Sequence, residues 1–139
     1  MSYRQPPDTR APSVGILASL AVLATVVAPF FLIRPTEAGV YYDAPTLVPV
    51  HLVIGVFASV AIIVFAAGRN GRTDPETAAG ATVVLGGFVA LLALWWAIAV
   101  GDIVGSLTEN AAFDYHRWVL VAAAFALAGS AGWYAREVL

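Results

Sequence analysis

The stretch VHLVIGVFASVAIIVFAAGRNGRTDPETAAGATVVLGGFVALLALWWAIAV, residues 50–100, decides the fold, because one short polar segment separates two long apolar runs. The runs, 50–67 and 78–100, each have about the length that an α-helix needs to cross the hydrocarbon core of a bilayer. The polar segment GRNGRTDPETAAG, 68–80, has the glycine, asparagine and proline content of a tight turn. The stretch therefore predicts a hairpin of two antiparallel membrane helices.

The polar segment also contains signals for the helix ends on either side of it. Gly68 is placed to close the first helix of the hairpin. Thr73 and Glu76 have the spacing of a capping box, and Pro75 falls in the first turn of the second helix, where proline is tolerated.

The composition indicates that the whole chain is a membrane protein. Of 139 residues, 60% are hydrophobic and only 12% are charged, whereas soluble domains are nearer one half and one quarter. Further apolar runs cover 14–33, with Pro29 near its end, and 118–134. We expect one all-α domain, a transmembrane four-helix bundle with up-down-up-down topology. Residues 1–12 form a polar tail, and the first run is a retained span rather than a signal peptide.

Arginine placement predicts the orientation of the bundle. Five arginines fall on one side of the predicted spans and two on the other; the five are Arg4, Arg10, Arg69, Arg72 and Arg136, and the two are Arg34 and Arg117. Positively charged residues favour the cytoplasmic side. We therefore expect a multi-pass protein of the cell membrane, with both termini in the cytoplasm.

Residue types that are absent or sparse restrict the function. There is no cysteine and no lysine, and the net charge is −2, which excludes thiolate metal sites and disfavours a nucleic-acid partner. No predicted span has a charged residue at its centre, which argues against a proton-coupled transporter and an intramembrane hydrolase. We expect no catalytic residue and favour a protein that is not an enzyme.

Small residues recur at helical spacing in the predicted spans. In lipid, helices associate through close backbone approach, which small side chains permit. The residues that we expect to form packing or interface surfaces are Gly55, Ser59, Gly86, Ala90, Ala97, Gly101, Gly105, Ala124, Ala128 and Gly132. These stripes are compatible with packing inside one bundle and with contact to a partner subunit or a second copy.

The chain has two histidines, His51 and His116, and each stands at the outer end of a span. The second and fourth spans run parallel in such a bundle, so two inward-facing imidazoles at similar depth could ligate haem b from both faces, with Gly55 leaving room for the porphyrin edge. The alternative is that both histidines are boundary residues that bond to loop carbonyls. A zinc site needs further ligands that no spacing singles out.

The fourth span is flanked by residues that suit the membrane interface. Arg117 and Trp118 precede its apolar run, and Trp133 and Arg136 end it. Aromatic rings and cations of this kind lie at headgroup level, so we expect these four residues to anchor the helix in the bilayer.

Two stretches, IVFAAGRNGRTDPETAAGATVVLGGF (63–88) and HRWVLVAAAFALAGSAGWYAR (116–136), resemble a group of small four-span membrane proteins of halophilic archaea that has no assigned function. The resemblance implies a four-helix membrane fold and a haloarchaeal cell membrane. It implies no catalytic or ligand residue.

Three functions remain open from the sequence. The first is a non-enzymatic accessory, assembly or scaffold subunit, which acts through helix–helix contacts with a membrane-protein partner or a second copy. The second is an electron-transfer protein with a b-type haem on His51 and His116. The third is a small oligomeric channel or carrier, although the spans contain few hydroxyl residues to line a polar path.

Overall fold

The computed structural model of the chain describes residues 9–43, 49–101 and 112–139, and this part is all-helical. Its helices are α1 (Arg10–Val27), α2 (Pro29–Leu32), α3 (Pro35–Asp43), α4 (Val50–Arg69), α5 (Pro75–Val100) and α7 (Ala112–Val138). The expectation of an all-α fold is confirmed. The helix α3 lies between the predicted spans 14–33 and 50–67, outside the predicted membrane helices.

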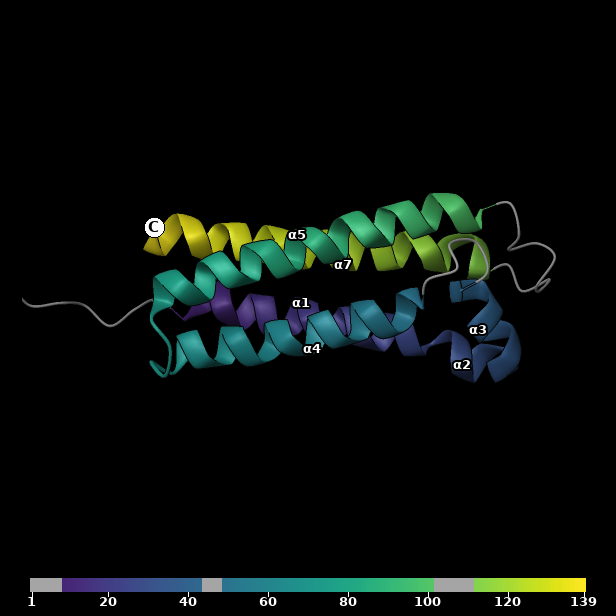
Figure 1. Cartoon of the computed structure of the whole chain (residues 1–139), viewed down its shortest axis with the longest axis horizontal. Helices are drawn as coiled ribbons and strands as arrows, with labels where there is room; N and C mark the ends of the chain where they lie inside the picture. Colours follow the sequence, from purple (N-terminus) through teal and green to yellow (C-terminus); the bar gives the residue numbers. More distant parts are fainter. Residues whose placement is uncertain (1–8, 44–48, 102–111) are drawn as a thin grey trace, which may run out of the picture.

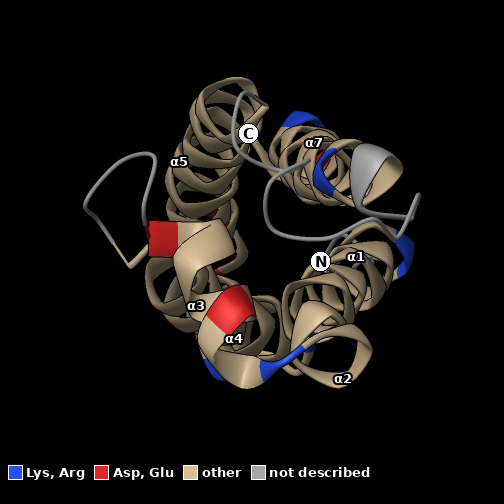
Figure 2. Ribbon diagram, turned by 90° about the vertical axis from the view of Figure 1, so that its right-hand side faces the viewer, with Lys and Arg blue, Asp and Glu red and all other residues tan. Residues whose placement is uncertain are grey.

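Four long helices form the bundle, with α1 and α5 diagonally opposed, and α4 and α7 likewise (Figures 1 and 2). Successive long helices run in opposite directions, so the start of α1 and the end of α7 lie at the same end (Figure 1). We call this the hairpin end, because the α4–α5 turn lies there, and the opposite end, which carries α2 and α3, the aromatic end. The α1–α2 segment, α4, α5 and the Tyr115–Val138 part of α7 are each long and apolar enough to cross a membrane.

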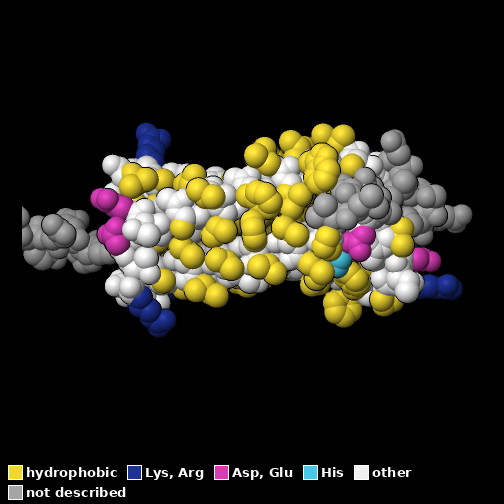
Figure 3. All heavy atoms as spheres, viewed as in Figure 1, with side chains coloured by type: hydrophobic (Ala, Val, Ile, Leu, Met, Phe, Trp, Pro, Cys, Tyr) yellow, Lys and Arg dark blue, Asp and Glu magenta, His cyan; other side chains and the backbone are white. Residues whose placement is uncertain are grey.

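The surface matches that reading. Hydrophobic side chains are spread along the length of the face drawn in Figure 3, and the charged side chains lie at its two ends. Several of the most exposed side chains are large and apolar: Leu17, Phe31, Ile63, Val84, Leu91 and Ile98. A water-facing surface rarely presents so much contiguous apolar area, so the protein is suited to a bilayer.

The hairpin turn differs in detail from the expected one. The helix α4 continues to Arg69, and Gly71, with φ at 77°, takes the left-handed conformation after it. Gly68 is instead buried within α4, where an added methyl group would lie 2.7 Å from the Cβ of Ala78. At the start of α5 the N-cap is Asp74, which accepts a hydrogen bond from the backbone N–H of Thr77 at 3.4 Å. The capping box assigned to Thr73 and Glu76 was therefore wrong by one position.

The small residues divide into those inside the bundle and those outside it. Gly86 faces α7 closely: a methyl group added there would lie 3.0 Å from the Cα of Ala128. Ala90, Ala97 and Ala124 are buried, and Ala128 and Gly101 are partly buried. By contrast Ser59 and Gly132 are exposed, and Gly55 is partly buried but does not pack against another helix, since an added Cβ at either glycine would meet nothing within 4 Å. Gly105 lies outside the described residues.

Candidate functional site

The aromatic end holds a cluster of rings contributed by five helices. We call it the aromatic cluster, and it consists of Phe30, Tyr41, Tyr42, His51, Trp96 and His116. Tyr41, Tyr42 and Trp96 are fully buried, and His116 is only 8% exposed. Centroid distances between neighbouring rings run from 5.0 Å upward, as in packed aromatic pairs.

A proline explains why polar side chains gather at this point. Pro29 has no N–H, so the carbonyl of Thr25, four residues earlier, lacks its usual helical donor. The Nε2 of His116 lies 2.6 Å from this carbonyl oxygen and takes the place of that donor. The Tyr42 hydroxyl donates to the next carbonyl, that of Val26, at 2.6 Å. Side chains from α7 and α3 thus satisfy carbonyls at the end of α1, which would otherwise be costly in hydrocarbon.

The contacts of His116 also fix its tautomer. A carbonyl only accepts, so Nε2 carries the proton, and Nδ1 of the neutral ring accepts from the Tyr41 hydroxyl 3.0 Å away. The indole N–H of Trp96 donates to the backbone carbonyl of Tyr41 at 3.1 Å. These bonds join α1, α3, α5 and α7, so they close the aromatic end of the bundle.

Burial governs how the two tyrosines of α3 respond to pH. Burial raises the pKa of Tyr41 well above its ordinary value of 10.0, and the nearby Arg117 guanidinium offsets part of that rise. Burial likewise raises the pKa of Tyr42, and the neighbouring Tyr41 adds to it. Both phenols therefore remain neutral in the folded protein at pH values where an exposed tyrosine ionises.

We expect the protein to lose stability as the pH rises above about 10. Ionisation of the tyrosines at such pH stabilises the unfolded chain. The folded state cannot be stabilised in the same way, because the raised pKa values of Tyr41 and Tyr42 keep both phenols neutral. The stabilisation is fully present below the ordinary tyrosine pKa and disappears as the pH climbs toward the raised values. Tyrosinate difference absorbance, followed during an alkaline titration, should show these two ionising only with unfolding. Early ionisation that is lost in Tyr41→Phe and Tyr42→Phe would contradict the buried placement.

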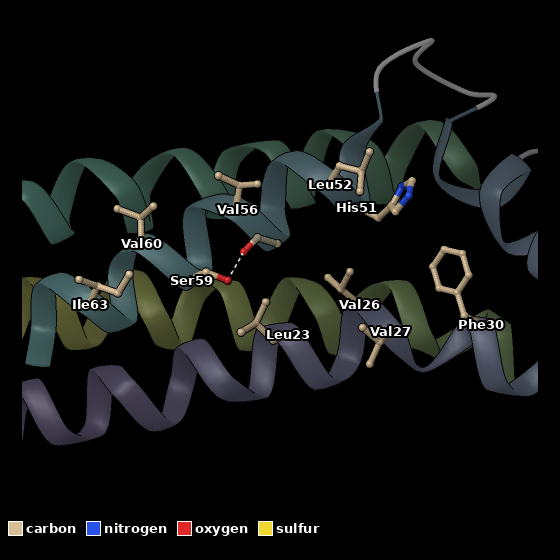
Figure 4. Close-up of a pocket in the computed structure, with 11 residues that line it drawn as sticks. Leu23, Val26, Val27, Phe30, His51, Leu52, Val56, Ser59, Val60 and Ile63 are labelled. Atoms are coloured by element: carbon tan, nitrogen blue, oxygen red, sulfur yellow. Dashed lines mark hydrogen bonds between the residues drawn. The ribbon is translucent and has the colours of Figure 1, made fainter.

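His51 differs from His116 because it lies at the surface of the bundle. Its ring stacks on Tyr42 at 5.0 Å and is tilted against Phe30 at 5.5 Å. Its Nδ1 lies 3.4 Å from a carboxylate oxygen of Asp43, but neither atom has a hydrogen-bond partner. The ring stands at one end of an outer groove between α1 and α4 with a volume of about 470 Å³ (Figure 4).

The two histidines therefore have different surroundings. His51 borders the groove between α1 and α4, and His116 borders a second groove, between α1 and α7. Tyr42 contacts both rings, at 5.0 Å and 6.5 Å. A haem ligated by both histidines would have to displace this tyrosine and one of the two hydrogen bonds of His116. Gly55 lines the outer groove, so the open space beside it does not lie between the two histidines. Within the described residues, no three histidine or carboxylate side chains group as a metal site.

The expected anchors lie at the two ends of α7. Trp118 and Trp133 are exposed at opposite ends of the helix, with the Arg117 guanidinium 5.6 Å from the Trp118 ring centroid. Trp133 donates through its indole N–H to Glu137 at 2.9 Å, and Arg136 is exposed in the last turn. These positions fit interfacial anchors.

Sequence reasoning missed Tyr41 and Tyr42 as members of the site. In the sequence they stand between two predicted spans, but α3 folds back over the bundle end and buries both. The available signal was Pro29, because a proline within an apolar run leaves carbonyls that require donors from elsewhere.

Comparison with known proteins adds one match. A family model described as "Family of unknown function (DUF7548)" matches residues 6–139. Neither the curated proteins nor the solved structures contain a significant match.

Proposed function

The chain belongs to DUF7548, a family of unknown function, and we propose its role from its own structure. It is a non-enzymatic membrane protein that acts as an accessory, assembly or scaffold subunit through lateral helix–helix contacts. The interior supports this role rather than transport. The buried hydroxyls of Ser19, Thr82 and Ser130 each donate to a carbonyl of their own helix, so none of the three offers a free polar group to a path through the bundle.

The main support for the proposal is a row of small residues on the outer face of α7. Ala122, Ala126 and Gly129 are exposed in succession along it, and an added Cβ at Gly129 would meet nothing within 4 Å. The outer face of α5 instead presents large side chains, with Val84 71% and Leu91 68% exposed. Small residues in lipid allow a second helix to approach the backbone closely. The small residues of α7 thus leave room for a second helix beside the exposed side chain of Phe125, whereas the outer face of α5 presents larger side chains.

We expect Ala126→Leu and Gly129→Leu to weaken the association with the partner helix by about tenfold, because a leucine prevents close backbone approach and overpacking typically costs about 1–3 kcal/mol. The measurement is the amount of partner, or of a second copy, that is recovered with the protein from mildly solubilised native membranes. Val84→Leu on the outer face of α5 is the matched control and should change nothing. Full recovery with both α7 variants, or an unmodified protein that is strictly monomeric and alone, would refute the proposal.

The arginines support a cell-membrane protein with both termini in the cytoplasm. Within the described residues, Arg10, Arg69, Arg72 and Arg136 belong to the hairpin end, and Arg34 and Arg117 to the aromatic end. The excess favours a cytoplasmic hairpin end. Because the chain has no cysteine, a single cysteine at Asn70 or Thr36 can be labelled selectively. If the Asn70→Cys variant is labelled from outside intact cells, the hairpin end lies outside and the proposed orientation is wrong. The resemblance to proteins of halophilic archaea supports such an organism as the source.

A further inference from the structure

We propose that the groove between α1 and α4 binds a lipid with an extended hydrocarbon chain and an uncharged hydroxyl head. The groove is separate from the α7 face, because α4 and α7 are diagonally opposed in the bundle (Figure 2). Its walls come from α1, α2 and α4, and its lining includes Leu23, Val27, Phe30, Leu52, Val56 and Ile63 (Figure 4). A pocket of about 470 Å³ with an apolar lining and a few polar groups is typical of a small-molecule site.

The dimensions of the groove fit one chain better than a helix. Its lining extends along α4 from His51 to Ile63, which is about 18 Å at a rise of 1.5 Å per residue. An α-helix of about 10 Å diameter and the same length occupies about 1,400 Å³, which exceeds the groove volume of about 470 Å³, so a partner helix would lie largely outside the groove. A single extended hydrocarbon chain is thinner and can lie within it.

Among the described residues that line the groove between its ends, no side chain offers a free hydrogen-bonding group. The hydroxyl of Ser59 donates to the carbonyl of Gly55 on its own helix at 2.8 Å. Gly55 has open space where a side chain would project, which deepens the groove at mid-length. A ligand therefore meets hydrocarbon along its tail and polar groups only at one end.

The polar end indicates the kind of head. His51 is the second residue of α4, at the aromatic end, so it lies near the level of the membrane interface. The carboxylate of Asp43 lies 3.4 Å from Nδ1, so Nε2 is the ring nitrogen left for a ligand. A hydroxyl head suits an imidazole nitrogen, because a hydroxyl can either donate or accept a hydrogen bond. A phosphate is disfavoured, because it would approach the Asp43 carboxylate and because the described residues that line the groove include no arginine.

The test uses the purified full chain in proteoliposomes with a photoactivatable long-chain alcohol, whose diazirine lies in the middle of the chain. Labelling should map to the facing sides of α1 and α4, and the phosphate monoester of the same chain should label about fivefold less. His51→Ala should reduce labelling by the alcohol about fivefold through loss of one hydrogen bond. Gly55→Leu should reduce it about tenfold, because a leucine takes the room of at least two methylene groups.

Gly87→Leu is the matched control, since an added Cβ there also meets nothing and the residue does not line the groove. It should label like the unmodified protein, as should Ala126→Leu, so that failure of this proposal is distinct from failure of the proposed function. Equal labelling by alcohol and phosphate would overturn the assignment of the head. Unchanged labelling of Gly55→Leu, or a disulfide between two copies carrying Val56→Cys in the membrane, would overturn the site.

Discussion

Replacement of His116 by alanine should lower the free energy of unfolding by about 3 kcal/mol, because it removes two hydrogen bonds inside the bundle, one of them to a backbone carbonyl. The carbonyl of Thr25 would lose its donor, and the hydroxyl of Tyr41 would lose the imidazole acceptor. Neither can turn easily to water, since His116 and Tyr41 are buried where α1, α3 and α7 meet. The effect should exceed that of any exposed substitution on the same helix.

Reversible unfolding of the protein in mixed micelles, titrated with a denaturing detergent, measures this loss. His116→Gln should recover part of the stability, because its amide N–H can reach toward the Thr25 carbonyl as Nε2 does. His51→Ala should cost much less, since the Nδ1 of that ring has no hydrogen-bond partner. Equal losses for the two alanine variants, together with a visible Soret band lost in both, would instead indicate that the histidines ligate haem.

Replacement of Gly86 by leucine should cost at least about 3 kcal/mol, because the new side chain would enter a space already filled by backbone. A methyl group alone would lie 3.0 Å from the Cα and 3.3 Å from the backbone nitrogen of Ala128. Backbone atoms in a helix cannot move aside as a side-chain tip can, so α5 and α7 would have to separate.

Gly87→Leu, one residue further along, provides the control. An added Cβ at Gly87 meets nothing within 4 Å, and leucine favours a helix over glycine by roughly 1 kcal/mol. The same unfolding titration should therefore show opposite signs for the two neighbouring variants. If Gly86→Leu left the free energy of unfolding unchanged, α5 and α7 would not pack through this glycine.

The membrane helices could be predicted from the sequence, because the backbone of a long apolar run in lipid must pair its own N–H and C=O groups, as a helix does. The four spans correspond to α1 with α2, α4, α5 and α7. The residues at which the helices begin and end were harder to predict. Thr73 and Asp74 are adjacent residues that both suit an N-cap, and Gly68 and Gly71 both suit the end of a helix. The choice within each pair depends on which backbone conformation the packed hairpin allows.

The aromatic cluster could be predicted only in part. Pro29 was visible as a potential break, and His116 was visible as a polar residue at a span end. Which donor reaches the freed Thr25 carbonyl depends on how α3 and α7 dock against α1, which is a matter of tertiary packing. For the same reason, the spacing of small residues could not separate Gly86, which packs inside, from Gly55, which faces outward.

Photo-crosslinking from the outer face of α7 tests the central claim most directly. A photoreactive amino acid placed at Ala126 in native membranes should yield one prominent cross-linked product, either a second copy or one defined membrane protein. The same residue placed at Val84, on the outer face of α5, should cross-link only to lipid. Cross-linking only to lipid from both positions would contradict the claim that this protein acts through lateral helix contacts.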